Sequence, residues 1–317
     1  MEPFCGSCAV LLARPQPFGG LETVNDINVF LCNFWRSVAK DPDAVANAAD
    51  WPVMECDLYA RGNAIFYQDD WYKERGHDSV VDWVEWIRAN PDHHDPLVAG
   101  WWVWGQSCWI GGTWGRDEKV AEGNANLANQ MPELASGGRG VNRKMPHLAG
   151  SGRGIVRKGV CGSNEGDDIL PRKGGIYACM RALARRLRNV RACCGQWDRI
   201  LSPTITTDMG LTAVFLDPPY GDPNRVTVYG SDESFDVATD VRKWCKEHGD
   251  DTLLRIALCG YEGEHNELEE VGWTKMEWRA SGGYASKDSQ ASLNRHKERV
   301  WFSPHCVGGV SGFGLEW

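Results

Sequence analysis

The chain has 317 residues, a formal net charge of −9 and 42% hydrophobic residues, which suits a folded protein with a sizeable core. No stretch approaches the roughly 20 apolar residues of a membrane span, so a membrane-spanning protein is excluded and a soluble cytoplasmic protein is expected. The twelve cysteines are scattered through hydrophobic segments, which favours buried reduced thiols over a disulfide framework.

The first residues predict a tight turn, a helix and a strand. Small residues at Cys5–Cys8 precede an apolar helical stretch, and the short strand Glu22–Asp26 ends in an acid 20 residues after Gly6. That spacing is typical of nucleotide-binding folds, in which the acid accepts hydrogen bonds from ribose hydroxyls. Cys5 and Cys8 also have the spacing of a thioredoxin-like redox pair, which is a competing interpretation. No second Cys or His pair matches them, so no metal site is predicted.

Apolar residues at helical spacing follow the strand, and they predict an amphipathic helix with its aromatic residues in the core. They are Ile27, Leu31, Phe34, Trp35 and Val38. Eight tryptophans then lie between Trp71 and Trp114. Some are expected in the core, and others suit stacking on unpaired bases.

Two Gly- and Arg-rich repeats follow, at residues 132–144 and 146–158. They lie in a basic stretch, residues 137–191, with thirteen Lys and Arg against three Asp and Glu. Such a stretch in an acidic chain is typical of a nucleic-acid contact, with a solvated linker as the alternative. We expect the basic residues of the two repeats to contact DNA. They are Arg139, Arg143, Lys144, Arg153, Arg157 and Lys158.

Regular elements return after the repeats. A helix is predicted over 176–190 with Arg181, Arg185, Arg186 and Arg188 away from its apolar face, and a strand over 190–194 leads into the turn 195–197. Further along, a buried strand is predicted over 253–259. An antiparallel pair is predicted at 273–280 and 299–302.

The most informative segment is Leu211–Tyr220. Six mostly apolar residues without alternation predict a strand buried on both faces of a parallel sheet, and Asp217-Pro218-Pro219-Tyr220 follows. These polar residues are therefore expected at the carboxyl edge of the sheet, where open α/β sheets bind ligands. A turn that merely ends a core strand is the alternative.

The tetrapeptide resembles the catalytic motif of Dam-like DNA adenine N6-methyltransferases of phage and bacteria, and Glu2-Pro-Phe-Cys-Gly-Ser-Cys8 resembles their cofactor motif. The resemblance implies an α/β, Rossmann-like class I methyltransferase sheet with helices on both faces. It implies a catalytic domain of residues 1–70 and 172–306, an inserted target-recognition region of residues 71–171, and a tail of residues 307–317. It also implies a cell of prokaryotic or phage-infected type, a restriction-modification context, and a monomer or weak dimer.

The implied activity is site-specific transfer of a methyl group from S-adenosylmethionine to adenine N6 in double-stranded DNA. The exocyclic amine is a poor nucleophile, so Asp217 and the Pro218 carbonyl would accept its two N–H groups, Pro219 would restrict the backbone, and Tyr220 would lie on the base. The residues implied to bind the cofactor are Glu2, Pro3, Phe4, Gly6, Asn25, Asp26, Gln196, Trp197 and Asp217.

Three features depart from the family. Gln196 and Cys8 stand where relatives carry Asp and Gly, and the Cys8 side chain is expected to weaken cofactor binding. The family also has a Phe-x-Gly-Gly-Lys segment and a central strand ahead of Glu2, whose loss would leave two strands without ladder partners. A catalytically impaired DNA-binding homologue is therefore one alternative. Methylation of another planar amine, such as an RNA base or cytosine N4, is a second.

Overall fold

The computed structural model describes residues 1–15, 19–110, 140–141, 175–220, 233–277 and 297–306. The chain forms two compact units, one of residues 1–4 and 197–317 and the other of residues 5–196. Both units combine helices with β-strands, which confirms the mixed α/β class. Among the described residues, no helix is long and apolar enough to cross a membrane.

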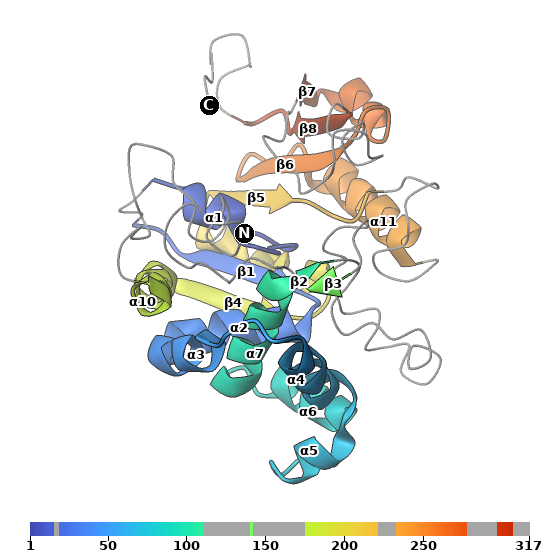
Figure 1. Ribbon diagram of the computed structural model, residues 1–317. Coiled ribbons are helices and arrows are strands. Elements are labelled where there is room, and N and C mark those ends of the chain that lie inside the picture. Colours follow the sequence, from blue (N-terminus) through green and yellow to red (C-terminus); the bar gives the residue numbers. More distant parts are fainter. Residues whose placement is uncertain (16–18, 111–139, 142–174, 221–232, 278–296, 307–317) are drawn as a thin grey trace. The chain divides into compact units, whose positions relative to one another are not determined.

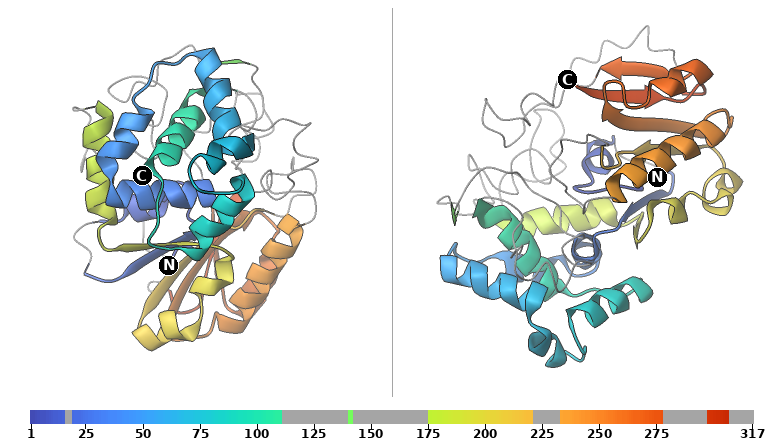
Figure 2. Two further views of the ribbon diagram at one scale, coloured as in Figure 1. Left: turned by 90° about the horizontal axis from the view of Figure 1, so that it is seen from below. Right: turned by 90° about the vertical axis from the view of Figure 1, so that its right-hand side faces the viewer.

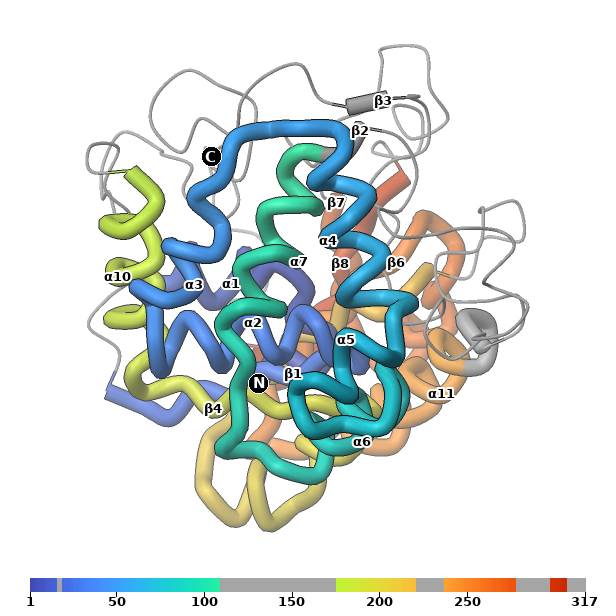
Figure 3. The backbone as a smooth tube through the Cα atoms, turned by 60° about the horizontal axis from the view of Figure 1, so that its bottom comes forward, coloured from blue at the N-terminus to red at the C-terminus, as the bar shows by residue number. Residues whose placement is uncertain are grey.

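The unit of residues 5–196 is mostly helical (Figures 1 and 3). Its elements are α1 (Ala9–Ala13), β1 (Glu22–Asp26), α2 (Val29–Lys40), α3 (Pro42–Ala49), α4 (Glu55–Tyr67), α5 (Asp69–Lys73), α6 (Val80–Ala89), α7 (Pro96–Cys108), β2 (Trp109–Ile110), β3 (Gly140–Val141), α10 (Gly175–Leu187) and β4 (Val190–Cys194). The strands β1 and β4 pair in parallel with Asp26 opposite Cys194, and β2 pairs antiparallel with β3.

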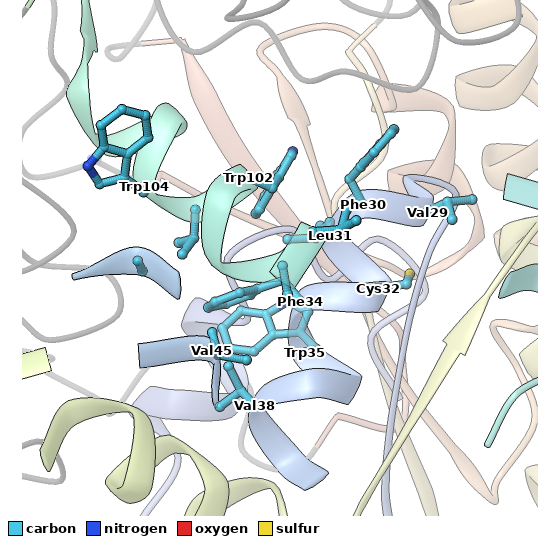
Figure 4. Close-up of a cluster of buried hydrophobic side chains, with 14 of the residues drawn as sticks. Val29, Phe30, Leu31, Cys32, Phe34, Trp35, Val38, Val45, Trp102 and Trp104 are labelled. Carbon is cyan, nitrogen blue, oxygen red and sulfur yellow. The ribbon is translucent and has the colours of Figure 1, made fainter. Parts of the chain in front are cut away.

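The helix α2 lies at the centre of this unit's core. The predicted helix is confirmed, but ten consecutive residues, Val29–Val38, are buried, so this part of the helix is covered on all faces and not on its apolar face alone. The cover comes from α3, α7 and α10, which all contact α2. Figure 4 shows Phe34 and Trp35 of α2 packed near Val45 of α3 and Trp102 of α7. Part of the tryptophan-rich segment is therefore core, as predicted.

Glycine at position 100 permits the close packing of α7 on α3. A Cβ built there would lie 2.4 Å from the Cβ of Ala48 and 2.8 Å from the carbonyl oxygen of Val45. We therefore expect Gly100→Ala to lower the free energy of unfolding by about 1–3 kcal/mol, despite the better helix propensity of alanine. Urea denaturation measures this change. Gly19→Ala is the control, because a Cβ at Gly19 would meet no atom of the described part of the chain within 4 Å. An equal loss in both variants would contradict the packing argument.

A buried ion pair links α10 to β1. Arg186 donates to both carboxylate oxygens of Glu22, at 2.7 and 2.8 Å, and to the carbonyl oxygen of Leu11 at 2.6 Å. Both side chains are at most 7% exposed. The prediction that Arg186 lies away from the buried face of its helix is therefore wrong.

Among the described cysteines, ten are free thiols, but Cys179 is disulfide-bonded, which corrects the expectation of reduced thiols throughout.

The other unit contains a four-stranded sheet in the order β5-β6-β8-β7. Its elements are η1 (Trp197–Ile200), η2 (Pro203–Ile205), η3 (Thr207–Met209), β5 (Thr212–Leu216), α11 (Glu233–His248), β6 (Leu254–Tyr261), η4 (Asn266–Val271), β7 (Thr274–Glu277) and β8 (Glu298–Phe302). The strands β5 and β6 are parallel, whereas β8 pairs antiparallel with both β6 and β7. Figure 2 shows α11 running alongside this sheet.

The described strands thus form one four-stranded and two two-stranded sheets. A single Rossmann-like sheet is not confirmed. The strands β1 and β4 to β8 lie close to where the sequence predicted strands, whereas β2 and β3 were not predicted. The strand β5 also differs from its prediction, because Ala213 is exposed and Phe215 only half-buried. Met1 lies beside β5 and makes two hydrogen bonds with it. Its backbone nitrogen donates to the carbonyl oxygen of Ala213 at 2.7 Å, and its carbonyl oxygen accepts from the amide of Phe215 at 2.9 Å.

Candidate functional site

The turn after Phe4 brings two backbone positions into the left-handed region. Gly6 has a φ of 45° and Cys8 a φ of 55°, and Cys8 is the one described non-glycine residue with a positive φ. The amide of Cys8 donates to the carbonyl oxygen of Cys5 at 2.6 Å, which closes the turn. A left-handed residue with a Cβ costs roughly 1–2 kcal/mol. The backbone at position 8 is therefore one that glycine suits better.

Asp26 holds this turn from the carboxyl end of β1. One oxygen of its buried carboxylate accepts from the amide of Gly6 at 3.0 Å, and the other accepts from the amide of Asn28 at 2.9 Å. The indole nitrogen of Trp35 donates to the carbonyl oxygen of Gly6 at 3.1 Å. Burial raises the pKa of Asp26, and the backbone hydrogen bonds oppose that shift. Both backbone groups of Gly6 are thus fixed.

The carboxyl ends of β1 and β4 are tied together at the same place. The side-chain amide of Asn25 donates to the carbonyl oxygen of Gly195 at 2.9 Å, and the amide of Gly195 donates to the carbonyl oxygen of Asp26 at 3.0 Å. Gln196, the next residue, is exposed. The structure thus brings Gly6, Asn25 and Asp26 together at one edge of this unit.

Cys5 and Cys8, which have the spacing of a redox pair, lack the properties of a redox centre. Cys5 and Cys8 are buried, and the neighbouring Cys8 thiol together with burial raises the pKa of Cys5 well above its ordinary value. Cys32 donates its thiol hydrogen to the carbonyl oxygens of Asp26 and Cys193, both at 3.3 Å. A reactive cysteine needs a lowered pKa and access to solvent. The thioredoxin-like interpretation is therefore disfavoured.

In the other unit, the segment of residues 1–4 carries part of the cofactor motif. Glu2 and Pro3 are buried, and the ring of Phe4 stacks on Trp197 with 6.1 Å between ring centroids and 23° between ring planes. Trp197 also makes an edge contact with Trp244 of α11, at 6.3 Å. Phe4 and Trp197 are both among the residues predicted for the site, and their rings stack on each other. Nothing in the sequence singled out Trp244.

The tetrapeptide lies directly beyond the end of β5. Asp217 is exposed, Pro218 is buried, and Pro219 and Tyr220 are half-buried. The hydroxyl of Tyr220 donates to a carboxylate oxygen of Asp217 at 2.9 Å. Burial, and next the negative charge of Asp217, raise the pKa of Tyr220 well above its ordinary value. The phenol, which stays protonated, thus donates to the carboxylate of Asp217 at the carboxyl edge of the sheet.

A second tyrosine, which the sequence did not reveal, contacts this pair. Tyr261 is the last residue of β6, and its ring meets that of Tyr220 edge to face, with 4.6 Å between centroids and 67° between planes. Since β5 and β6 are parallel neighbours, both tyrosines lie at the same sheet edge. Pairing the two predicted strands in parallel was the signal that would have placed Tyr261 beside the motif.

Behind Tyr261, His265 is fully buried against Trp301, with 5.0 Å between ring centroids. Burial, and next the positive charge of Arg242, lower the pKa of His265 to about 4, and the backbone of Cys259 opposes this shift only in part. Neither ring nitrogen makes a well-aligned hydrogen bond with a described residue. His265 is therefore neutral at pH 7.

This histidine should make the stability depend on pH. Because its pKa falls from 6.5 to about 4 on folding, the unfolded chain binds the proton more readily between these values. We expect the free energy of unfolding to fall as the pH drops from 6.5 towards 4, by up to about 1.4 kcal/mol per pH unit from this group. Urea titrations at several pH values of wild type and His265→Asn isolate the contribution. Parallel pH curves for the two proteins would contradict it.

The six basic residues assigned to DNA lie outside the described residues, and so do the repeats that contain them. They are Arg139, Arg143, Lys144, Arg153, Arg157 and Lys158. Of the predicted recognition region, the structure describes residues 71–110 and 140–141. The helices α6 and α7 of that part contribute Trp83, Trp102 and Trp104 to the same core as α2.

Residues 1–59 match the family model of D12 class N6 adenine-specific DNA methyltransferases. The match includes the cofactor motif, β1 and Asp26, and it confirms the resemblance to adenine N6-methyltransferases of DNA. It also supports methylation of DNA as the activity. A search of curated proteins found no match.

Proposed function

We propose that this protein transfers a methyl group from S-adenosylmethionine to N6 of adenine at a defined site in double-stranded DNA. The observation that carries the proposal is the pairing of Asp217 with Tyr220 at the carboxyl edge of β5. An acceptor and an aromatic face stand together there, as a planar amine requires. The family match over residues 1–59 supports the same activity.

The tetrapeptide would act on the amine by accepting its hydrogens. The carboxylate of Asp217 accepts one N–H and the backbone carbonyl of Pro218 accepts the other, which localises the nitrogen lone pair for attack. A carboxylate has about four acceptor positions, so the hydrogen bond from Tyr220 is compatible with a second donor. Tyr220 offers its ring to the face of an extruded base, and extrusion costs a few kcal/mol. Asp217 can also receive the proton that the amine loses.

Two observations support S-adenosylmethionine as the donor. A Cβ built on Gly6 would meet no atom of the described residues within 4 Å, so a ligand can approach that backbone closely. Asp26 is a buried carboxylate with its oxygens oriented by two backbone amides, which suits ribose hydroxyls. When bound, the cofactor supplies an electrophilic methyl group on a sulfonium.

Further residues are assigned to the cofactor in each unit. In one unit, Phe4 and Trp197 offer stacked aromatic rings. In the other, Asn25 ties the ends of β1 and β4 together beside Asp26. Cys8 is expected to lower the affinity relative to a glycine at that position. The remaining residues assigned to the cofactor are Glu2, Pro3, Gln196 and Asp217.

Methyl transfer to DNA tests the proposal. The full chain is incubated with radiolabelled S-adenosylmethionine and DNA from a host that lacks adenine methylation, and poly(dG)·poly(dC) is the matched control without adenine. We expect label in the first DNA and background in the second. Equal label in both would indicate a cytosine amine instead. Calorimetry that detects DNA binding but no binding of the cofactor would favour the catalytically impaired homologue.

A further inference from the structure

The last residue of β6 adds a ring to the candidate catalytic pair. Tyr261 meets Tyr220 edge to face, at 4.6 Å between centroids and 67° between ring planes. Such pairs have a preferred geometry and contribute about 0.5–1.5 kcal/mol beyond the area they bury. The contact therefore restricts the plane in which the ring of Tyr220 lies.

Tyr220 is held at a second point, because its hydroxyl donates to Asp217 at 2.9 Å. A contact at the ring and a hydrogen bond at its far end together fix one orientation of the side chain. Any change in the ring plane would also move the hydroxyl that Asp217 accepts. The orientation of the carboxylate is thus coupled to the ring contact.

The backbone of Tyr261 is anchored in turn. Its amide donates to a carboxylate oxygen of Glu264 at 2.9 Å, and the amide of Glu264 donates to the carbonyl oxygen of Tyr261 at 3.0 Å. Arg242 of α11 donates to the carbonyl oxygen of Glu264 at 2.9 Å. A Cβ on Gly260 would lie 2.6 Å from the ring of His265. This turn therefore has little freedom to shift Tyr261.

We propose that Tyr261 is a positioning residue, which holds Tyr220 and through it the carboxylate of Asp217 in the orientation that receives the amine. The inference rests on the proposed function, and it adds a residue outside the tetrapeptide. It assigns the positioning to the ring of Tyr261, which makes the contact with Tyr220. Tyr261 is half-buried, so it is not a residue enclosed in the core.

Two substitutions at position 261 separate positioning from packing. We expect Tyr261→Leu to lower kcat about 10- to 100-fold, as a misplacement of about 1 Å at a reacting centre does, with little change in the KM for DNA. Tyr261→Phe keeps the ring and should retain most of the rate. Tyr59→Leu is the matched control, because Tyr59 is exposed on α4. Wild-type kcat in Tyr261→Leu would overturn the inference, and so would an equal loss in Tyr261→Phe.

A crystal structure of Tyr261→Leu decides the same question without activity. The expected result is a folded protein in which the hydroxyl of Tyr220 has left the carboxylate of Asp217. A hydrogen bond retained near 2.9 Å would overturn the positioning role. If the wild-type chain transfers no methyl group, the proposed function fails, whereas this structure still tests what holds Tyr220. The two failures are therefore distinguishable.

Discussion

Asp217→Ala is expected to lower kcat for methyl transfer by on the order of 10²–10³-fold or more, because it removes an oriented acceptor of the amine hydrogens. The side chain is exposed and follows β5 directly, so its loss should leave the sheet intact. Radiolabel incorporation at saturating DNA and cofactor measures the effect. The affinity for S-adenosylmethionine, measured by calorimetry, should change much less than kcat.

The matched control for this substitution is Asp208→Ala. Asp208 is also an exposed aspartate of the same unit, in η3, and has no assigned role. Its replacement should leave kcat near the wild-type value. Equal rates in Asp217→Ala and wild type would refute the role of the carboxylate. An equal loss in both variants would show that the assay reports damage to the fold.

Arg186→Met is expected to lower the free energy of unfolding by up to about 3–5 kcal/mol, because it removes the two short hydrogen bonds to the buried carboxylate of Glu22 and leaves the longer contact with Arg14, at 3.5 Å. The pair joins residues 164 positions apart, and Arg186 also donates to the backbone of Leu11. The loss should therefore loosen α1 and β1 together. Urea denaturation followed by circular dichroism measures the change.

Two further variants test the cause. Arg181 lies on the same helix as Arg186, and Arg181→Met removes its exposed ion pair with Asp43 of α3. Exposed ion pairs contribute little to stability, so the urea midpoint of this variant should stay close to that of wild type. The double variant Arg186→Met with Glu22→Leu removes both buried charges and should recover part of the lost stability. A single Arg186→Met variant as stable as Arg181→Met would contradict the account.

Local patterns predicted most strands and the helices α1, α2 and α10, but not the helices α3 to α7 or α11. The strand β1 has the predicted bounds, because Thr23 and Val24 favour a strand and Asn28 then caps the next helix. Parallel pairing of β5 with β6 places Asp217 at the sheet edge where the motif predicted it. Both predictions rest on residues that are neighbours in the sequence, whereas the pairing of β5 with β6 joins distant segments and came from the structure.

Contacts between residues far apart in the sequence could not be predicted from local patterns. The helix α2 has an amphipathic pattern, but α7 covers its remaining face from about 60 residues away, and no local period encodes that cover. Arg186 forms its buried ion pair with Glu22, and the ring of Tyr220 contacts that of Tyr261. Each of these contacts joins two distant segments of the chain. The left-handed backbone at Cys8 was signalled only by the glycine that the resemblance placed there.

The most direct test of the central claim is the identity of the methylated product. DNA without adenine methylation is incubated with the full chain and S-adenosylmethionine, digested to nucleosides and analysed by mass spectrometry. The account predicts N6-methyldeoxyadenosine with the wild-type chain and only a trace with Asp217→Ala. N4-methyldeoxycytidine in its place, or no methylated nucleoside from a folded wild-type chain, would contradict it.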